Sequence, residues 1–346
     1  MSWLGYAGTL GAEFVHQIVT DPVASPPETA GMYAEKCRPR RIPPTPARSC
    51  AAPRAPQPTT GGRTWRRFVY LSGSTLLCSD HAVSRREVAL QHGRAPHDAW
   101  PSHYPAPLAP GSAFNASDPA AQVPTRAGLL GKSAHVPCLC SFNQLYKLGP
   151  ETWRRWVRVL RRAPHAVLWQ LEFDEEAVDA CLALGAEAGL APERLLFTPL
   201  LAPRLELLTK GHCDLYLDTW PFNAHSTAKD ALWAGVPVLT LPGEPLAARL
   251  AASLVALVLP GAPGVARTPD DYEETATRLA AAPAARARLR GELRARRWHS
   301  PAFDPVTWAA QFSRALRAEA DLILAGCSPP ARAEAMHLLI VPPRAP

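Results

Sequence analysis

The sequence lacks the features of a secreted or membrane-spanning chain. It has no run of roughly 18 or more apolar residues, so neither a transmembrane helix nor a membrane partner is expected. Residues 1–14 have neither a basic stretch nor a long apolar core, which argues against a secretory signal peptide. These absences predict a cytoplasmic protein, with the nucleus as an alternative.

Patterns of metal-binding cysteines are also missing. The chain has 8 cysteines but no C-x-x-C pair, and Cys138-Leu139-Cys140 alone is not half of a zinc site. In a reducing compartment the expected state of these cysteines is the free thiol. The sequence therefore predicts free thiols and no bound metal.

The chain is basic but lacks the pattern of a nucleic-acid-binding protein. Its formal net charge is +7, mostly from arginine. The arginines gather in the stretch 38–67 and on the polar faces of expected helices. Aromatic residues do not alternate with them in a way that would stack on bases. We therefore expect no nucleic-acid partner.

The density of proline divides the chain into stretches of different character. Residues 1–36 combine glycines with apolar residues and look folded. Residues 37–130 contain much of the proline and have too few large apolar side chains for regular structure. One apolar island within them, at 68–77, suits a strand. From about residue 133 the sequence becomes strongly patterned.

That patterned region alternates between apolar strand-like runs and amphipathic helix-like runs. Strands are expected at 136–142, 166–171, 194–201, 215–218 and 236–241. Helices are expected at 150–162, 175–188, 205–210, 227–234, 245–256, 269–281, 285–297 and 305–324. Such alternation is typical of an α/β protein with a doubly wound parallel sheet.

Two polar loops follow strands of this expected sheet. The segment 223–227 (NAHST) stands between a strand and a helix, and the segment 143–147 (NQLYK) follows the strand at 136–142. Taken alone, the first segment suits a helix N-cap, because Ser and Thr accept hydrogen bonds from free helical N–H groups. Taken together, the two loops share the carboxyl edge of the sheet and offer Lys147 and His225, which favours a site for an anionic ligand such as a nucleotide.

Several blocks of this region resemble the catalytic region of the O-GlcNAc transferase family, glycosyltransferase family 41. The blocks are SFNQLYK (141–147), DLYLDT (214–219), NAHSTAKDALWAGVPVLTLPGE (223–244) and SPAFD (300–304). The block WLGYAGTLGA (3–12) resembles the end of the first catalytic lobe of that family. The resemblance is specific over about 133–324, weaker over 1–36 and absent between them.

The resemblance implies a GT-B fold, in which two Rossmann-like lobes face each other and UDP-GlcNAc lies mostly against the second. Members of this family move N-acetylglucosamine onto Ser or Thr hydroxyls of intracellular proteins. The implied partners are therefore a UDP-sugar donor and protein acceptors, with no cofactor and no metal. No D-x-D motif of the kind that holds a cation on a sugar diphosphate occurs in the sequence.

The same resemblance divides the chain into four parts. Residues 1–36 would be the remnant of an N-terminal catalytic lobe, 37–130 a Pro/Arg-rich segment, 131–326 the complete UDP-sugar-binding lobe, and 327–346 a tail. The earlier part of the first lobe and the tetratricopeptide repeats of the family have no counterpart here. A catalytically inactive, truncated remnant that at most binds UDP is therefore an alternative, as is a protein O-fucosyltransferase-like enzyme of the same fold.

In the loop after the first strand, the resemblance assigns two site residues. Gln144 matches a glutamine near the nucleotide and diphosphate. Lys147 matches the lysine that contacts the phosphates and supports the departing UDP, and it is the expected catalytic residue. Further along the chain, the resemblance matches Arg204 to a basic residue near the base, although the histidine of that motif is absent and Glu206 falls near its place.

In and after the loop that follows the strand at 215–218, the resemblance assigns four further site residues. His225, Ser226 and Thr227 match a His-Thr-Thr triplet that binds the diphosphate. Asp230, one helical turn further on, matches an aspartate that holds the ribose hydroxyls.

Overall fold

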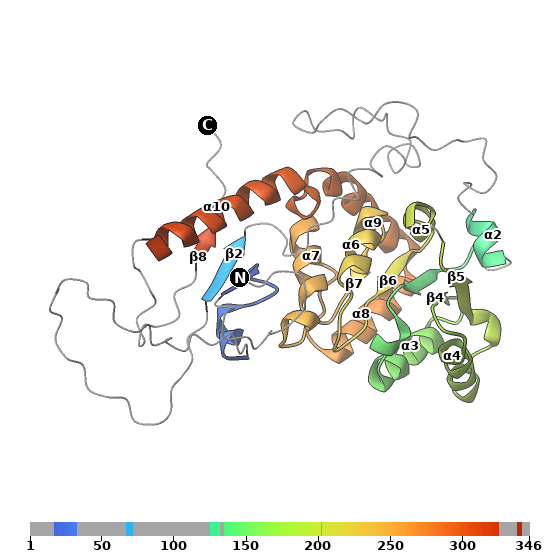
Figure 1. Cartoon of the computed structure of the whole chain (residues 1–346). Helices are drawn as coiled ribbons and strands as arrows, with labels where there is room; N and C mark the ends of the chain where they lie inside the picture. Colours follow the sequence, from blue (N-terminus) through green and yellow to red (C-terminus); the bar gives the residue numbers. More distant parts are fainter. Residues whose placement is uncertain are drawn as a thin grey trace, which may run out of the picture.

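A computed structural model describes residues 17–32, 67–71, 125–131, 135–201, 203–324 and 338–340 of the chain (Figure 1). Its larger sheet is entirely parallel and has the strand order β5-β4-β3-β6-β7. These strands are β3 (Cys138–Ser141), β4 (Val167–Glu172), β5 (Leu195–Pro199), β6 (Leu215–Leu217) and β7 (Val238–Leu239). The predicted α/β class with a doubly wound parallel sheet is confirmed.

The helices of this unit follow the predicted pattern closely. They are α3 (Pro150–Arg162), α4 (Glu175–Glu187), α5 (Pro203–Lys210), α6 (Ser226–Trp233), α7 (Leu250–Val258), α8 (Pro269–Ala281), α9 (Pro283–Arg296) and α10 (Pro305–Leu324). Helix α4 ends as expected before Gly189, whose φ of +74° is accessible to glycine at little cost. Proline at the first turn starts α3, α8 and α9.

Two elements of this region differ in extent from the prediction. The helix expected at 245–256 is a short 3-10 turn (Leu246–Ala248) followed by α7, because Arg249 between them leaves the helical conformation. Strand β7 is shorter than the expected 236–241, since it pairs only with β6 at the edge of the sheet. Beyond it, Thr240 makes an isolated parallel bridge with Val265.

Alternate residues of each central strand face two separate apolar clusters, as the pleat of a strand requires. Cys140, Trp169 and Tyr216 belong to the cluster that includes residues of α5, α6 and α7. Leu139 and Leu168 belong to the cluster that includes residues of α3 and α8. The sheet is therefore covered on both faces, and its strands are apolar throughout for that reason.

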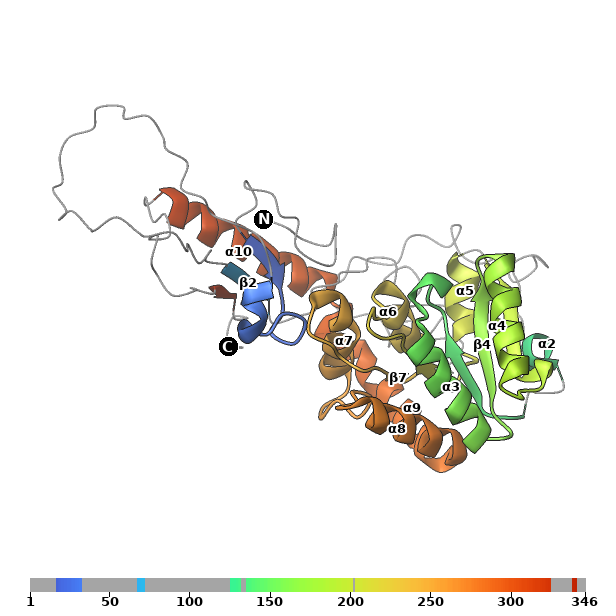
Figure 2. The same ribbon diagram turned by 90° about the horizontal axis from the view of Figure 1, so that it is seen from below.

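A second, smaller sheet has the order β1-β2-β8, again with parallel pairs. Its strands are β1 (Gln17–Thr20), β2 (Arg67–Leu71) and β8 (Leu338–Ile340). Strand β2 confirms that the apolar island contains a strand, whereas β8 comes from the stretch expected to be a tail. In both views α10 extends from the larger unit across this sheet (Figures 1 and 2). The rest of the predictions for 1–16 and 33–124 lies outside the described residues.

The two units are also joined at the loop after β1. The guanidinium of Arg249 donates from Nε to the carbonyl of Val23 at 2.8 Å and from Nη1 to that of Gly243 at 2.8 Å. Ala24 is fully buried in the core of the larger unit. Arg249 therefore has a structural role between the two units.

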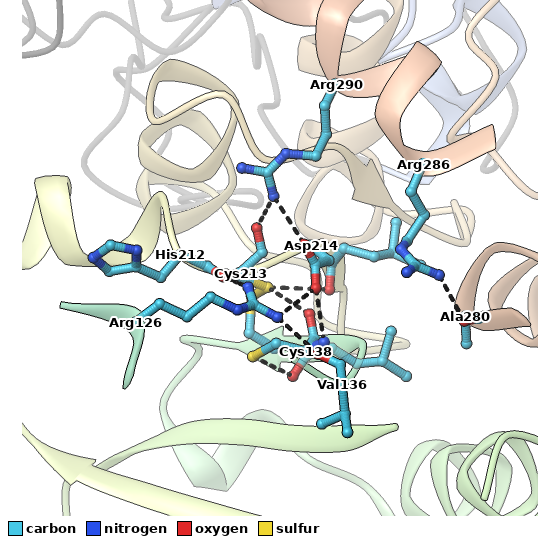
Figure 3. A network of polar contacts seen from close by, with 12 residues as sticks. Arg126, Val136, Cys138, His212, Cys213, Asp214, Ala280, Arg286 and Arg290 are labelled. Carbon is cyan, nitrogen blue, oxygen red and sulfur yellow. Dashed lines mark hydrogen bonds and ion pairs between the residues drawn. A yellow bond between two sulfur atoms is a disulfide. The ribbon is translucent and has the colours of Figure 1, made fainter. Parts of the chain in front are cut away.

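The amino-terminal edge of the larger sheet is held by one carboxylate (Figure 3). Asp214 accepts hydrogen bonds from Arg126 at 2.8 Å and from the backbone N–H of Cys138 at 2.9 Å, and Arg290 lies 3.5 Å away. Arg126 also donates to the carbonyls of His212 and Val136. Its short helix α2 (Arg126–Leu130) falls within the stretch expected to be poor in regular structure, and these contacts explain why it is ordered here.

The prediction of free thiols is wrong for one pair of cysteines. Cys140 and Cys213 are joined by a disulfide, although they lie 73 residues apart in the sequence. Strands β3 and β6 are neighbours in the sheet, which brings the two Cα atoms to 6.1 Å. Cys138 and Cys181 are buried free thiols, and burial raises the pKa of Cys138 to about 12.

Candidate functional site

The candidate site lies where the winding of the larger sheet reverses. From β3 the chain proceeds outward through β4 to β5, and from β6 it proceeds outward on the other side to β7. The loops after β3 and β6 therefore diverge at the carboxyl edge, and ligands of doubly wound sheets bind in the crevice between such loops. Lys147 belongs to the first loop and His225 to the second.

Lys147 connects these two loops. Its ammonium donates to the carbonyl of Asn223 at 3.2 Å and lies 4.1 Å from the ring centroid of Phe222. Burial lowers the pKa of Lys147, and the nearby carboxylate of Asp218 opposes that shift. The structure thus places a partly desolvated cation at the mouth of the second loop.

His225 stands at the N-cap position of α6. Its Nε2 lies 3.1 Å from the carbonyl of Ala247, so this nitrogen carries the proton and donates. Burial, with a smaller contribution from the charge of Lys147, lowers the pKa of His225 to about 4, although the bond to Ala247 opposes this shift. The imidazole is therefore neutral at pH 7.

The start of α6 is not capped in the way that local sequence suggested. The N-cap position falls on His225 rather than on a Ser or Thr, and its side chain makes no capping hydrogen bond within the described residues. The first N–H groups of the helix, those of Ser226 and Thr227, thus remain available at the positive end of the helix dipole. Such an end favours an anion.

Asp218 holds the loop that carries His225, and sequence reasoning missed it. This carboxylate is 1% exposed and accepts from the N–H of Ala224 at 2.6 Å, the hydroxyl of Thr240 at 2.6 Å and the amide of Asn143 at 3.3 Å. Burial raises the pKa of Asp218 to about 7, against the effect of these donors and of Lys147. A carboxylate directly after an apolar strand is the signal that could have found it.

Asn143 ties the two loops together. Its amide donates to the hydroxyl of Thr219 at 2.7 Å, and its carbonyl oxygen accepts from the hydroxyl of Thr227 at 2.7 Å. The hydroxyl of Thr227 is therefore already engaged within the protein. Its backbone N–H is the group it can offer to a ligand.

Asp230 lies next to the buried cation of Lys210, which the sequence analysis did not identify as part of the site. Lys210 of α5 is 4% exposed, and its ammonium lies 2.7 Å from Glu206 and 3.3 Å from Asp230. Lys210 thereby orients one oxygen of Asp230. The signal in the sequence was the spacing of Glu206 and Lys210, which places both on one face of a helix.

The remaining predicted residues are less closely connected to the site. Gln144 and Ser226 are exposed, and neither side chain makes a hydrogen bond within the described part of the chain. Arg204 belongs to α5, but its side chain lies outside the described residues. The structure thus brings Lys147, His225 and Thr227 together and leaves Gln144 at the rim.

Within the described ranges, no group of three or more His, Cys, Asp or Glu side chains is arranged to hold a metal ion. Nor does any helix in the described part of the chain combine the length and hydropathy needed to cross a membrane.

His225 should make stability depend on pH. Its pKa is about 4 in the folded protein and 6.5 in the reference state, so the unfolded chain binds more protons between these values. The stabilisation is complete above pH 6.5 and is lost as the pH falls toward 4. Urea unfolding of wild type and His225→Gln should show a difference in free energy that grows with pH across this window.

The glutamine side chain can still donate to the carbonyl of Ala247, and Asp218 titrates in both proteins. The difference between their free energies of unfolding therefore reports the titration of the imidazole alone. A difference that stays constant from about pH 4 to pH 6.5 would show that His225 titrates normally.

The doubly wound fold, with a candidate site at the carboxyl edge of its sheet, places this protein in the class of GT-B glycosyltransferases. The structure is similar to a mutant O-GlcNAc transferase from Thermobaculum terrenum, with a TM-score of 0.57 and 25% identity. The match covers 87% of this chain and 45% of that protein. The predicted GT-B architecture, with one complete Rossmann-like lobe and part of another, is confirmed.

The sequence model of glycosyl transferase family 41 matches residues 120–312, and the chain belongs to this family. It is 28% identical over 314 residues to the probable UDP-N-acetylglucosamine–peptide N-acetylglucosaminyltransferase SEC of Arabidopsis thaliana, covering 91% of this chain and 26% of that protein. It is 36% identical over 166 residues to the UDP-N-acetylglucosamine–peptide N-acetylglucosaminyltransferase of Caenorhabditis elegans, covering 48% of this chain and 14% of that protein. The chain thus spans about a quarter or less of the length of these relatives.

Proposed function

We propose that this chain carries the donor site of an enzyme that transfers N-acetylglucosamine from UDP-N-acetylglucosamine to Ser and Thr hydroxyls of proteins. The observation that carries this proposal is the position of Lys147: where the sheet winding reverses, its ammonium donates to the carbonyl of Asn223, shortly before the uncapped start of α6. The names of the Arabidopsis and Caenorhabditis relatives supply the donor and the acceptor class.

In this proposal each site residue meets one part of the donor. The N–H groups at the start of α6 and the ammonium of Lys147 bind the diphosphate, with Gln144 and Ser226 at its rim. His225 is held by Ala247 so that its other ring nitrogen faces away from that bond. Asp230, oriented by Lys210, binds the ribose hydroxyls, and Arg204 is assigned to the neighbourhood of the base.

The proposed reaction moves the sugar from a phosphate oxygen to a hydroxyl oxygen. The bond between the anomeric carbon and the bridging oxygen of the β-phosphate breaks, and negative charge grows on the departing UDP. Lys147 and the helix start stabilise that charge in the transition state more than in the ground state, which lowers the barrier. The acceptor hydroxyl oxygen forms the new bond to the anomeric carbon, and its proton passes to water or to the departing UDP.

The proposal also assigns the parts of the chain. Residues 131–326 form the lobe that binds the UDP-sugar. Residues 1–36 belong to the N-terminal lobe, and their strand β1 lies in the smaller sheet. The acceptor would enter between the two lobes.

Calorimetric titration with UDP, with GDP as the matched control, tests the donor assignment. Saturable binding of UDP and clearly weaker binding of GDP are expected. Incubation with radiolabelled UDP-N-acetylglucosamine and a Ser/Thr-rich peptide then tests transfer. Binding of GDP in preference to UDP would overturn the donor assignment, and binding of UDP without transfer of label would limit this chain to donor binding.

A further inference from the structure

A wide groove separates α3 from α4 on the outer surface of the larger unit. It has a volume of about 990 Å³, and its lining is largely apolar. Trp153 and Val157 contribute from α3, and Leu148 and Phe173 contribute from the loops. We call this feature the α3–α4 groove.

The groove exists because the α4 side chains that face it are mostly small. Ala177, Ala180, Cys181 and Ala188 all line it, and they leave a hollow where larger residues would fill the space between the helices. Leu184 of the same stripe is 47% exposed, and Tyr146 at the mouth of the groove is 76% exposed. An apolar surface of this extent is typical of a contact site.

The two sides of the groove carry opposite charges. The α3 side presents Arg154, Arg158 and Arg161, and the α4 side presents Asp174 and Glu187. The sequence from 174 to 188 contains acidic residues but no Lys or Arg. The groove is therefore bordered by a basic helix on one side and an acidic helix on the other.

These charges do not neutralise each other across the groove. No ion pair joins α3 to α4 in the part of the chain that the structure describes. Arg154 lies 3.6 Å from Glu151 of its own helix, and Arg158 lies 2.8 Å from Glu273 of α8. An occupant of the groove could thus pair with both sides at once.

We propose that the α3–α4 groove binds an amphipathic helix of a partner protein. The apolar stripe of that helix covers the floor, carboxylates line its flank beside α3, and lysines or arginines line its flank beside α4. A helix suits the site because α3 and α4 each run for 13 residues, about 20 Å, and a third helix can lie between two such ridges. The opposite charges of the two sides specify the charges of the partner.

A partner bound in this groove would lie beside the candidate donor site. Gln144 and Leu145 line the groove and belong to the same loop as Lys147. The docking depends on the lining of the α3–α4 groove and on no step of the reaction, so it stands independently of the proposed function.

The test uses two designed helical peptides of about 14 residues with the same composition. Both carry a leucine stripe; in one, Glu occupies one flank and Lys the other, and in its control Glu and Lys alternate on both flanks. Fluorescence anisotropy with the full chain should show at least about tenfold tighter binding of the segregated peptide. Equal binding of the two peptides would overturn the proposal.

Variants of the chain locate the binding. Leu184→Asp introduces a charge into the groove, and Ala180→Trp fills its hollow, so each should weaken binding of the segregated peptide by at least about tenfold. Arg154→Glu together with Arg161→Glu should remove its advantage over the control peptide. Leu316→Asp, at a similarly exposed position of α10, should leave binding unchanged.

Two further results would contradict the proposal. One is binding of the segregated peptide that neither Leu184→Asp nor Ala180→Trp weakens. The other is concentration-dependent dimerisation of the wild type, seen by sedimentation and abolished by Leu184→Asp, because the groove would then hold a second copy of the chain. Circular dichroism of each variant verifies that it is folded.

Discussion

Replacement of Lys147 by alanine should lower the affinity of the chain for UDP by about ten- to a hundredfold. The ammonium is the cation that joins the two loops at the carboxyl edge, and a charge-assisted hydrogen bond to phosphate contributes about 1.5–3 kcal/mol. Its partial burial strengthens the effect, because water screens the interaction less. Calorimetric titration of wild type and variant with UDP measures the change.

A matched control separates this local contact from the loss of net charge. Arg278→Ala also removes one positive charge, but from an exposed position of α8. It should bind UDP like the wild type. If both variants lose the same affinity, the attraction is a property of the whole basic chain, and Lys147 has no special role.

The proposed catalytic role of Lys147 predicts that its replacement by alanine lowers the rate of transfer in addition to the affinity for UDP. If Lys147 stabilises departing UDP, transfer by Lys147→Ala at saturating donor should fall as well, since the charge that it meets is greatest in the transition state. A variant with weaker UDP binding but unchanged turnover would restrict Lys147 to holding the ground state.

Replacement of Trp156 by alanine should lower the free energy of unfolding by about 3–5 kcal/mol. This indole is fully buried between the sheet and α8, and its N–H donates to the hydroxyl of Tyr272 at 3.1 Å. The substitution leaves a cavity and a weakened contact between α3 and α8. Urea unfolding followed by circular dichroism measures the difference.

Trp156→Phe is the control for this prediction. It keeps most of the apolar volume and loses the hydrogen bond, so its cost should be about 1–2 kcal/mol. A loss below about 1 kcal/mol for Trp156→Ala would mean that the core collapses around the missing ring. Tyr272 also donates to the carbonyl of Asp218 at 2.9 Å, so the alanine variant should weaken UDP binding through the loop that Asp218 holds.

The helices were the most predictable part of the fold. In α3, apolar residues recur at helical spacing after Pro150, and the predicted bounds agree with the structure. The strands were predicted in place but less well in length, as β7 illustrates, because a strand ends where its neighbour stops pairing. The strand β8 depends entirely on distant partners, and nothing in its local sequence distinguished it from a tail.

The candidate site likewise consists of residues that the sequence predicted and residues that it did not. The resemblance supplied Lys147 and His225, and the structure places both at the carboxyl edge of the sheet. The residues that hold them, Asp218 and Asn143, were missed because their roles depend on hydrogen bonds to residues far away in the sequence. Lys210 was missed for the same reason, since its contact with Asp230 joins two helices.

By itself the sequence determined the α/β class, the order of the elements, and the two polar loops that follow β3 and β6. These features follow from local patterns of apolar and polar residues, which set the period of each element. Only the tertiary structure decided that Cys140 meets Cys213, that Asp218 is buried beneath the second loop, and that α3 and α4 leave a charged groove between them. Each of these depends on how distant segments pack, and packing is decided by the whole chain rather than by any one segment.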